Sequence, residues 1–440
     1  MQRPILYTLT SDLHSEMAPD VHQETFIRDL ESALGSAFNC RGDDFTDFGR
    51  QDGLIYVRTG GTEGMFLKKV VPALVQAGAI SPEGVKPVRL LTSGMSNSLA
   101  ASMEILSWLR QHGYAGEILH GSTAEIARRI RALLSSGPDS GPTEAAPECP
   151  WVSPCSFGRI LAGKRYGVIG KPSDWLISSD VDYAAVRESL GAGLVDIPIE
   201  ELIAEARQGG PEMPPIPGYP PAYREGSPEN TPDSGPALKP LNPPKYGRKI
   251  DAADWNGALA IYGALKRLVA RYRLDGLTLR CFDLLTALHN TGCLALAILN
   301  AQGITATCEG DIPAMLSMAV AQARTGGASF QVNLSRIDGD RLLFAHCTVP
   351  LSIVRDYCYD THFESGIGVA VHGELPEGPV TLFKLSPDCR RMFRCEARLT
   401  VNTYGDRLCR TQVVVDAPGA AAYFLRTPIG NHHIIVPGIL

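Results

Sequence analysis

The chain has 440 residues, of which 44% are hydrophobic and 20% are charged, and its formal net charge is −6. This composition is typical of a soluble globular protein with two to three domains, and it argues against a disordered or membrane-spanning chain. Nucleic acid is not expected as a partner, because binding it usually takes clustered Lys and Arg.

The apolar and cysteine patterns indicate a cytoplasmic protein. The N-terminal segment "MQRPILYTLTSDLH" has no long apolar core, and no stretch approaches the ~20 apolar residues that span a bilayer. Eleven cysteines occur without CxxC pairs, which favours reduced thiols over disulfides or a Cys-rich zinc site. We therefore expect no membrane partner.

Residues 1–140 are predicted to form an N-terminal α/β domain. The segment 53–78, "GLIYVRTGGTEGMFLKKVVPALVQAG", is typical of a strand, a Gly-rich turn and an amphipathic helix. The segment 88–113, "VRLLTSGMSNSLAASMEILSWLRQHG", repeats that order. Alternating β and α units of this kind predict a doubly wound sheet.

A second α/β domain is predicted over 150–208 with part of 251–305. It follows a break rich in Pro, Gly and Ser, and it contains "KRYGVIGKPSDWLISSDVDYAAVRESLG" and "GLVDIPIEELIAEAR", each typical of a strand and a helix. Residues 209–250 are so rich in Pro that we expect a linker or surface excursion. A helix capped by Asp251 or Asp254 and a helix ending at Gly303 follow it.

The C-terminal domain, 306–440, is predicted to be rich in antiparallel strands. "SFQVNLSRIDGDRLLFAHCTV" is typical of two alternating strands around a DGD turn. Just before it, "ITATCEGDIPAM" predicts a short strand followed by a helix. Asp311 suits the N-cap of that helix, whereas Glu309 has no visible structural role. Because ligands bind at the carboxyl ends of strands in open α/β sheets, we expect Glu309 to be functional.

Histidines near the C-terminus add a second indication of chemistry. His346, His362 and the pair His432 and His433 lie in the strand-like segments "LLFAHCTVP", "YDTHFESG" and "GNHHIIVPG". Each alone is more often a structural residue. Together with a carboxylate such as Glu309, they suit a divalent ion that accepts mixed oxygen and nitrogen ligands, such as Mn²⁺.

These segments resemble a known family. The order "CEGDIPAMLSMA", a hairpin ending "FAHC" and a terminal "NHHIIV" resembles the metal-site segments of the L-fucose isomerase and L-arabinose isomerase superfamily. "TGGTEG", "SNSLAASMEIL" and "GKRYGVIGKPSDWLISSD" are similar to its shorter, fucose isomerase-like branch. The resemblance covers nearly the whole chain apart from the Pro-rich segment. It implies two Rossmann-like doubly wound units followed by an α/β plus antiparallel β C-terminal domain.

The resemblance implies a metal site and a base. Glu309 matches the carboxylate that binds the metal and acts as base, His346 matches the strand histidine, and His432 or His433 matches the terminal one. Asn333 stands where a second carboxylate is expected; it can bind a metal through its carbonyl oxygen but cannot act as a base. Either Asp311 or Asp338 replaces that carboxylate as a catalytic group, or the chemistry differs from that of the family.

The implied activity is a Mn²⁺-dependent aldose–ketose isomerisation of a monosaccharide through a cis-enediol, with Mn²⁺ replaceable by another divalent cation. The sugar can be a deoxy or anionic one, such as a sulfo-sugar. The alternatives are a metal-dependent lyase or epimerase on a sugar or sugar acid, and a catalytically inert sugar-binding relative. The resemblance also implies a homo-oligomer, a trimer or hexamer, in which a neighbouring subunit covers each active site.

Ten further residues are candidates for sugar contacts. Four are polar side chains that can equally form ordinary ion pairs, and six belong to two Gly-rich turns whose backbone shape alone can require glycine. The polar side chains are Arg280, Asp283, His362 and Glu364, and the turn residues are Thr59, Gly60, Gly61, Thr62, Glu63 and Asn97.

Overall fold

The computed structural model describes seven parts of the chain: 3–11, 20–50, 53–78, 87–135, 150–209, 250–405 and 407–440. The predicted linker at 209–250 lies outside the described residues except for its two end residues, so it stays a prediction. The chain is of mixed α/β class, with two parallel sheets and one antiparallel sheet that closes on itself. No described helix has both the length and the apolar character needed to cross a membrane.

The N-terminal domain is a doubly wound parallel sheet, as predicted. Its strand order is β2-β1-β3-β4-β5, so the order reverses between β1 and β3. Its strands are β1 (Ile5–Leu9), β2 (Asn39–Gly42), β3 (Gly53–Val57), β4 (Val88–Thr92) and β5 (Gly116–Leu119). Its helical segments are η1 (Val21–Gln23), α2 (Thr25–Leu34), α3 (Glu63–Met65), the π-helical η2 (Phe66–Val70), α4 (Val71–Gln76), α5 (Ser98–Gln111) and α6 (Thr123–Ser135).

Alternation along the strands explains why both faces of this sheet are covered. Successive side chains point to opposite faces, and both sets are apolar. Leu6 and Tyr56 pack with residues of α2 and α6 on one face, whereas Tyr7 and Ile55 belong to the core that includes residues of η2, α4 and α5. Helices on both faces therefore bury β1 and β4 fully and β3 nearly so, whereas the edge strand β2 is largely exposed.

The central sheet is also parallel, in the order β10-β9-β7-β8. Its strands are β7 (Arg165–Ile169), β8 (Gly193–Ile197), β9 (Gly276–Leu279) and β10 (Thr305–Cys308). Its helices are α7 (Tyr183–Ser189), α8 (Ile199–Arg207), α9 (Ala252–Tyr272), α10 (Asp283–Leu288), α11 (Cys293–Ala301) and α12 (Ile312–Thr325). Asp251 caps α9. Because β10 pairs with β9, this sheet extends just past the predicted domain boundary at 305/306.

The third sheet is a closed antiparallel barrel. The order β15-β18-β11-β12-β17-β16 closes because β15 also pairs with β16, and β6 adds to β16 from outside. The strands are β6 (Val152–Pro154), β11 (Phe330–Asp338), β12 (Arg341–His346), β15 (Gly378–Leu385), β16 (Arg391–Thr403), β17 (Thr411–Asp416) and β18 (His433–Pro437). A separate pair, β13 (Asp356–Asp360) and β14 (Ala370–Glu374), and the helix α13 (Ala421–Arg426) complete the fold.

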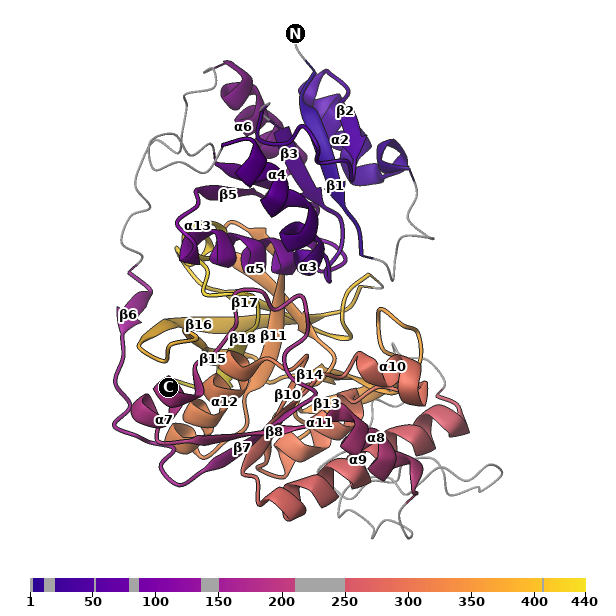
Figure 1. The fold of residues 1–440 in the computed structure, drawn as a ribbon, viewed down its shortest axis with the longest axis vertical. Helices are drawn as coiled ribbons and strands as arrows, with labels where there is room; N and C mark the ends of the chain where they lie inside the picture. Colours follow the sequence, from indigo (N-terminus) through magenta and orange to yellow (C-terminus); the bar gives the residue numbers. More distant parts are fainter. Residues whose placement is uncertain are drawn as a thin grey trace.

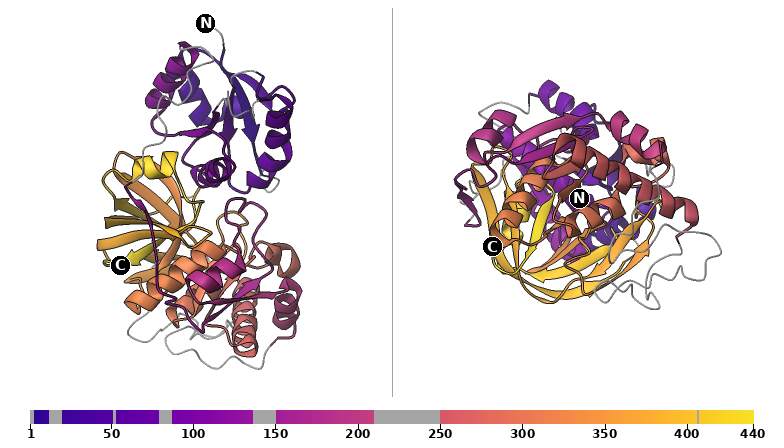
Figure 2. Two further views of the ribbon diagram at one scale, coloured as in Figure 1. Left: turned by 60° about the vertical axis from the view of Figure 1, so that its left-hand side comes forward. Right: turned by 90° about the horizontal axis from the view of Figure 1, so that it is seen from below.

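The N-terminal domain stacks on the other two parts, as Figures 1 and 2 show. Helix α5 contacts β11 of the barrel, and α12 lies between the central sheet and the barrel, touching β9, β10, β15 and β18. The segments that follow β1, β3 and β4 therefore face the segments that follow β7, β9 and β10. Two sets of strand carboxyl ends, the usual place for a ligand in such sheets, meet at one interface.

Gly310 gives a stability test of the turn after β10. It has φ +72°, and a Cβ there would lie 2.4 Å from the Lys171 carbonyl oxygen, a backbone atom that cannot easily yield. Gly326 has φ +73° but nothing within 4 Å, so Gly326→Ala carries only the left-handed backbone cost of about 1–2 kcal/mol. Gly310→Ala should lower the free energy of unfolding clearly more in denaturant titrations. Equal losses in the two variants would contradict this packing.

Candidate functional site

A cavity of about 190 Å³ lies where the three parts of the fold meet. The N-terminal domain contributes loop residues that follow its strands and the first turns of α5, the central domain contributes three strand-end residues, and the C-terminal part contributes three polar side chains. The lining residues are Ser11, Gly60, Gly61, Glu63, Asn97, Ala100, Ala101, Trp175, Phe282, Glu309, Asn333, Glu364 and Asn431. A single chain therefore supplies lining residues from both its N-terminal domain and its C-terminal half.

Glu309 stands at the carboxyl end of β10 in a strained backbone conformation. Its φ is +65°, which costs a residue other than glycine on the order of 1–3 kcal/mol. The turn is held because the Glu309 carbonyl accepts from the Ser173 N–H at 3.0 Å, and Gly310 packs against Lys171. The indole N–H of Trp175 donates to Glu309 Oε2 at 2.5 Å. The strain thus aims this carboxylate at the cavity.

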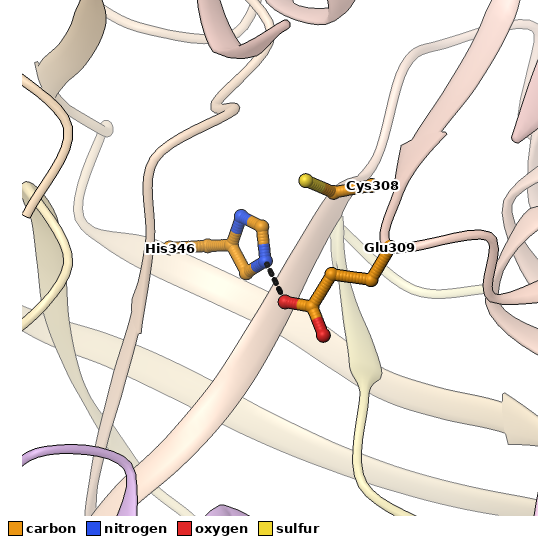
Figure 3. Close-up of side chains that lie close together, drawn as sticks. All are labelled: Cys308, Glu309 and His346. Atoms are coloured by element: carbon orange, nitrogen blue, oxygen red, sulfur yellow. Dashed lines mark ion pairs between the residues drawn. The ribbon is translucent and has the colours of Figure 1, made fainter. Parts of the chain in front are cut away.

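Two histidines face the other oxygen of Glu309. Nε2 of His432 lies 3.4 Å from Glu309 Oε1, and Nε2 of His346 lies 3.9 Å from the same atom, as Figure 3 shows for His346. Nδ1 of His432 bonds Asp311 Oδ2 at 2.9 Å, and Nδ1 of His346 bonds Thr348 Oγ1 at 3.0 Å. Each ring is therefore fixed through one nitrogen and presents the other to Glu309.

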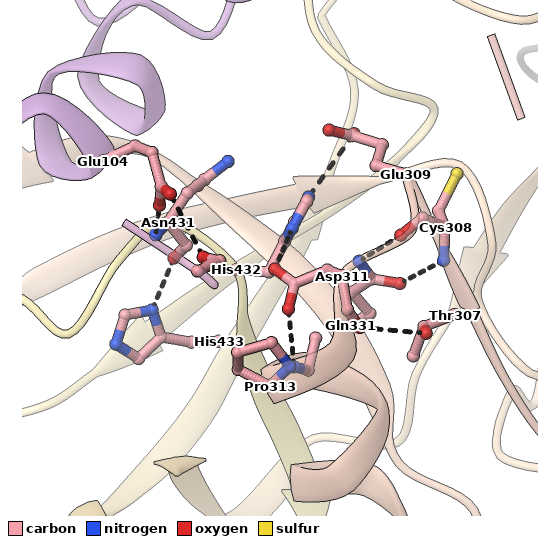
Figure 4. A network of polar contacts seen from close by, with 12 residues as sticks. Glu104, Thr307, Cys308, Glu309, Asp311, Pro313, Gln331, Asn431, His432 and His433 are labelled. Carbon is pink, nitrogen blue, oxygen red and sulfur yellow. Dashed lines mark hydrogen bonds and ion pairs between the residues drawn. The ribbon is translucent and has the colours of Figure 1, made fainter. Parts of the chain in front are cut away.

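Asp311 has two roles, which Figure 4 shows. Its Oδ1 accepts from the Ala314 N–H at 2.7 Å and so caps α12, as the sequence predicts. Its Oδ2 holds the His432 ring. With both oxygens occupied and no exposed surface, Asp311 positions a histidine and cannot act as a free base.

The charges of these buried groups depend on one another. Burial alone would raise the pKa of Glu309, but His432, His346 and the Trp175 N–H together lower it. Burial alone would lower the pKa of His432, yet Glu309 and Asp311 raise it to about 10. Burial and the neighbouring His432 lower the pKa of His346 to about 4. The carboxylates of Glu309 and Asp311 thus favour a positive charge on the His432 ring that lies between them.

The donor atoms around this position suit a divalent cation. Ligand atoms about 2.1 Å from one ion lie about 3.0 to 3.5 Å apart. The 3.4 Å from Glu309 Oε1 to His432 Nε2 falls in this range, and the 3.9 Å to His346 Nε2 lies above it. His432 Nε2 and Asn333 Oδ1 are buried and have no hydrogen-bond partner among the described residues. Cys308 Sγ lies within 4.8 Å of ligand atoms of Glu309 and His346, although it also contacts Cys281 Sγ at 2.9 Å. Oxygen and imidazole donors together fit Mn²⁺ or a similar ion.

The polar side chains from the N-terminal domain and from the loop after β13 complete the cavity wall. Asn97 Nδ2 donates to Glu364 Oε1 at 3.0 Å. Glu63 is only 2% exposed, and burial raises its pKa well above the usual value. Oδ1 of Asn97 and Asn431 and Oε2 of Glu63 are buried without a partner in the part of the chain that the structure describes. These groups are arranged to bind a polar ligand.

Two of the candidate ligands and catalytic groups lie apart from the candidate metal position. Asp338 is exposed beside the β11–β12 turn, opposite Arg341, so it cannot replace the missing carboxylate. His433 bonds the Tyr423 hydroxyl through Nε2 and the Asn431 carbonyl through Nδ1, and no ring nitrogen is left for a metal. His432 is therefore the residue of the pair that faces Glu309.

Several candidate sugar contacts also have structural partners instead. Arg280 forms ion pairs with Asp283 and Asp174, both at 3.0 Å, and its Nη1 donates to the Pro172 carbonyl. Neither Arg280 nor Asp283 lines the cavity. This is the ordinary ion-pair alternative that the sequence left open.

The remaining candidates either line the cavity or support its wall. Thr62 Oγ1 donates to the Thr59 carbonyl, and Thr59 Oγ1 accepts from the Ser11 N–H, each at 3.0 Å, so these two threonines hold the turn. Gly60 and Gly61 face the cavity itself. His362 packs edge-on against Phe282 with ring centroids 5.5 Å apart.

The sequence alone did not predict the aromatic part of the site or the role of Glu104, which holds two of its segments in place. Trp175, Phe282 and Asn431 line the cavity, and their only sequence signal is a place directly after predicted strands or before the histidine pair. Glu104, in the middle of α5, accepts from the Ser178 and Asn431 N–H groups at 2.7 Å each. A lone Glu in a helix gives no signal for such contacts.

No protein-family model matches the chain, and no curated protein matches it. The function proposed below therefore rests on the geometry of the site, with the resemblance of the sequence segments as support.

Glu364 gives a test of the charge balance in the metal-free protein. Burial, and then the nearby charge of Glu309, raise the pKa of Glu364 to about 8. Since the folded state holds this proton more tightly than the unfolded state, the stability that it contributes is complete below pH ~4.5 and is lost as pH rises towards about 8. Glutamine mimics the neutral acid and does not titrate. The melting temperature of Glu364→Gln should therefore rise relative to that of the wild type as pH rises from 5 to 8. Parallel melting curves would contradict the raised pKa.

Proposed function

We propose that the chain is a metal-dependent aldose–ketose isomerase that acts on a neutral monosaccharide. The observation that carries the proposal is the convergence of His346 Nε2 and His432 Nε2 on Glu309 Oε1, with both Nδ1 atoms held by other side chains. Histidines that bind a catalytic metal are commonly oriented in this way through the second ring nitrogen. The segment resemblance to the fucose and arabinose isomerase superfamily supports the same reading.

Glu309, His346, His432 and Asn333 would hold the ion. A divalent cation here would polarise the two adjacent sugar oxygens, make the proton alpha to the carbonyl more acidic, and stabilise charge that develops on oxygen. Glu309 is the base that moves the proton between C1 and C2. Its carboxylate is kept ionised by its neighbours, and Trp175 fixes its orientation.

The lining favours a neutral sugar over an anionic one. No Lys or Arg occurs among the described residues that line the cavity, whereas three glutamates do. An anionic substituent such as a sulfonate would need a cationic partner to offset its desolvation. The rings of Trp175 and Phe282 instead offer apolar surface, and the amides of Asn97 and Asn431 offer hydrogen bonds to hydroxyl groups.

A lyase or epimerase on the same scaffold is the second candidate, and Asn333 favours it. Because Asn333 stands where a carboxylate is expected, Glu309 is the only acidic ligand at the proposed metal position. The ligand set therefore carries one negative charge fewer. The inert sugar-binding alternative has less support, because a non-catalytic site would not need a strained, ionised carboxylate beside two oriented histidines. Proton exchange with solvent separates these alternatives.

Assembly into a closed homo-oligomer and a cytoplasmic location remain part of the proposal through the family resemblance. The described chain already combines Gly60 and Gly61 with Glu309 around one cavity. We therefore propose that each subunit completes its own site, with any oligomer contact lying outside the cavity.

Glu309→Gln tests the proposed function directly. The protein is loaded with Mn²⁺ and incubated with a panel of neutral aldoses in D₂O, and NMR follows deuterium at C1 and C2. Wild type should isomerise at least one sugar with deuterium uptake, and Glu309→Gln should lose turnover and bind Mn²⁺ more weakly, because the change removes a charged ligand and the base together.

The matched control is Asp338→Asn, which also removes one carboxylate but at the exposed hairpin turn, and it should leave both properties unchanged. Undiminished turnover in Glu309→Gln would end the proposal. Deuterium uptake without a ketose product would favour the epimerase instead.

A further inference from the structure

The cavity holds three glutamates in different environments. Glu309 faces two imidazoles, whereas Glu364 and Glu63 have no cationic partner within ion-pair distance among the described residues. These two acids come from different parts of the fold. Glu63 begins α3 of the N-terminal domain, and Glu364 lies in the loop between β13 and β14. The function proposed above uses only Glu309 and leaves both acids unexplained.

Accessibility separates the two unexplained acids. Glu63 is 2% exposed, and its Oε2 is buried without a partner in the described part of the chain. Glu364 is half-buried, lines the cavity and is oriented through Oε1 by the Asn97 amide. A ligand in the cavity can therefore reach the Glu364 carboxyl group, which is both held and accessible.

Isomerisation requires two kinds of proton movement. One proton moves between C1 and C2, and another moves between the two oxygens attached to them. Asn333 cannot perform the second transfer, since an amide is neither an acid nor a base near neutral pH, and Asp311 has both oxygens occupied.

We propose that Glu364 is the catalytic acid–base group that serves the substrate oxygens, with Asn97 as its positioning residue. This inference rests on the proposed isomerase function and names the group that replaces the missing second carboxylate. Neither the fold nor the order of sequence segments assigns that role to the loop between β13 and β14.

The transfer balances without a co-reactant. As Glu309 takes the proton from C2, the neutral Glu364 carboxyl group gives its proton to O1, which yields a neutral enediol. Glu309 then returns its proton to C1, and the Glu364 carboxylate takes the proton from O2, which yields the ketose. Both glutamates end in their starting protonation states.

The charge environment supports this division of labour. Burial and the Glu309 charge raise the pKa of Glu364 to about 8, while His432 and His346 help to keep the pKa of Glu309 low. Two carboxyl groups whose environments push their pKa values apart are typical of an acid and a base in one site.

The test compares Glu364→Gln with Glu377→Gln in the Mn²⁺-loaded protein, with a sugar that wild type isomerises. Glu364→Gln should lower kcat by about 10²–10⁴-fold, the usual range for loss of a general acid–base group, with a smaller change in KM and unchanged Mn²⁺ binding. Glu377→Gln makes the same change at an exposed position outside the cavity lining, and it should leave kcat unchanged. Infrared difference spectra at neutral pH should show a protonated-carboxyl band that Glu364→Gln removes.

The outcomes distinguish this inference from the proposed function. If wild type isomerises no sugar, the proposed function fails. If wild type is active and Glu364→Gln retains full kcat, or if Glu377→Gln loses kcat to the same extent, the assignment of Glu364 is wrong while the isomerase function stands. Circular dichroism and melting temperature check that each variant folds, and Glu364→Asp, which keeps the acid, should recover part of kcat.

Discussion

The buried carboxylate of Asp311 is the constraint on which the metal position depends. One oxygen begins α12 by accepting the Ala314 N–H, and the other fixes the His432 ring. Because a buried charge is costly unless its oxygens are hydrogen-bonded, neither contact can be lost cheaply. Asp311 follows the central strand β10, whereas His432 precedes the barrel strand β18. Their contact thus joins the central sheet to the barrel at the site.

Glu104 joins the N-terminal domain to the site in the same way, through a buried carboxylate that accepts hydrogen bonds from two distant segments. From the middle of α5, its Oε1 accepts from the Ser178 N–H and its Oε2 accepts from the Asn431 N–H. The first contact holds the segment that follows Trp175, and the second holds the residue beside His432 (Figure 4). Hydrogen bonds to charged groups contribute about 1.5–3 kcal/mol each. One helix therefore positions both the aromatic wall and His432, the histidine that faces Glu309.

The arrangement also explains how one chain brings distant segments together around the cavity. In doubly wound sheets, the carboxyl ends of the strands are left open for ligands. Here the open ends of two such sheets face each other, and the Glu104 contacts and the Asn97–Glu364 bond hold them together. The N-terminal turns supply shape and amides, while the central and C-terminal parts supply charge.

Local patterns in the sequence were enough to predict the elements that carry the site. The strand before Glu309, the Asp311 cap and the β11–β12 hairpin each depend on neighbours within a few residues, and the structure confirms all three. Such patterns could not choose between His432 and His433, because adjacent residues in a strand point to opposite faces and either face can be the inner one.

Contacts between distant segments were beyond the sequence for a different reason. The bond between Asn97 and Glu364 and the bond between Glu104 and Asn431 join residues that lie hundreds of positions apart. They exist only because α5 packs on the barrel. The choice of Asp338 as a catalytic candidate failed similarly: proximity along the chain to Asn333 did not bring it to the cavity, because the hairpin carries it outward.

The most direct test of the metal position is anomalous X-ray diffraction from crystals of the wild-type protein soaked in Mn²⁺. The proposed metal position predicts a single strong anomalous peak about 2.0–2.3 Å from Glu309 Oε1, His346 Nε2 and His432 Nε2, the distance range of metal–ligand bonds. A peak elsewhere, or none at saturating Mn²⁺, would contradict it.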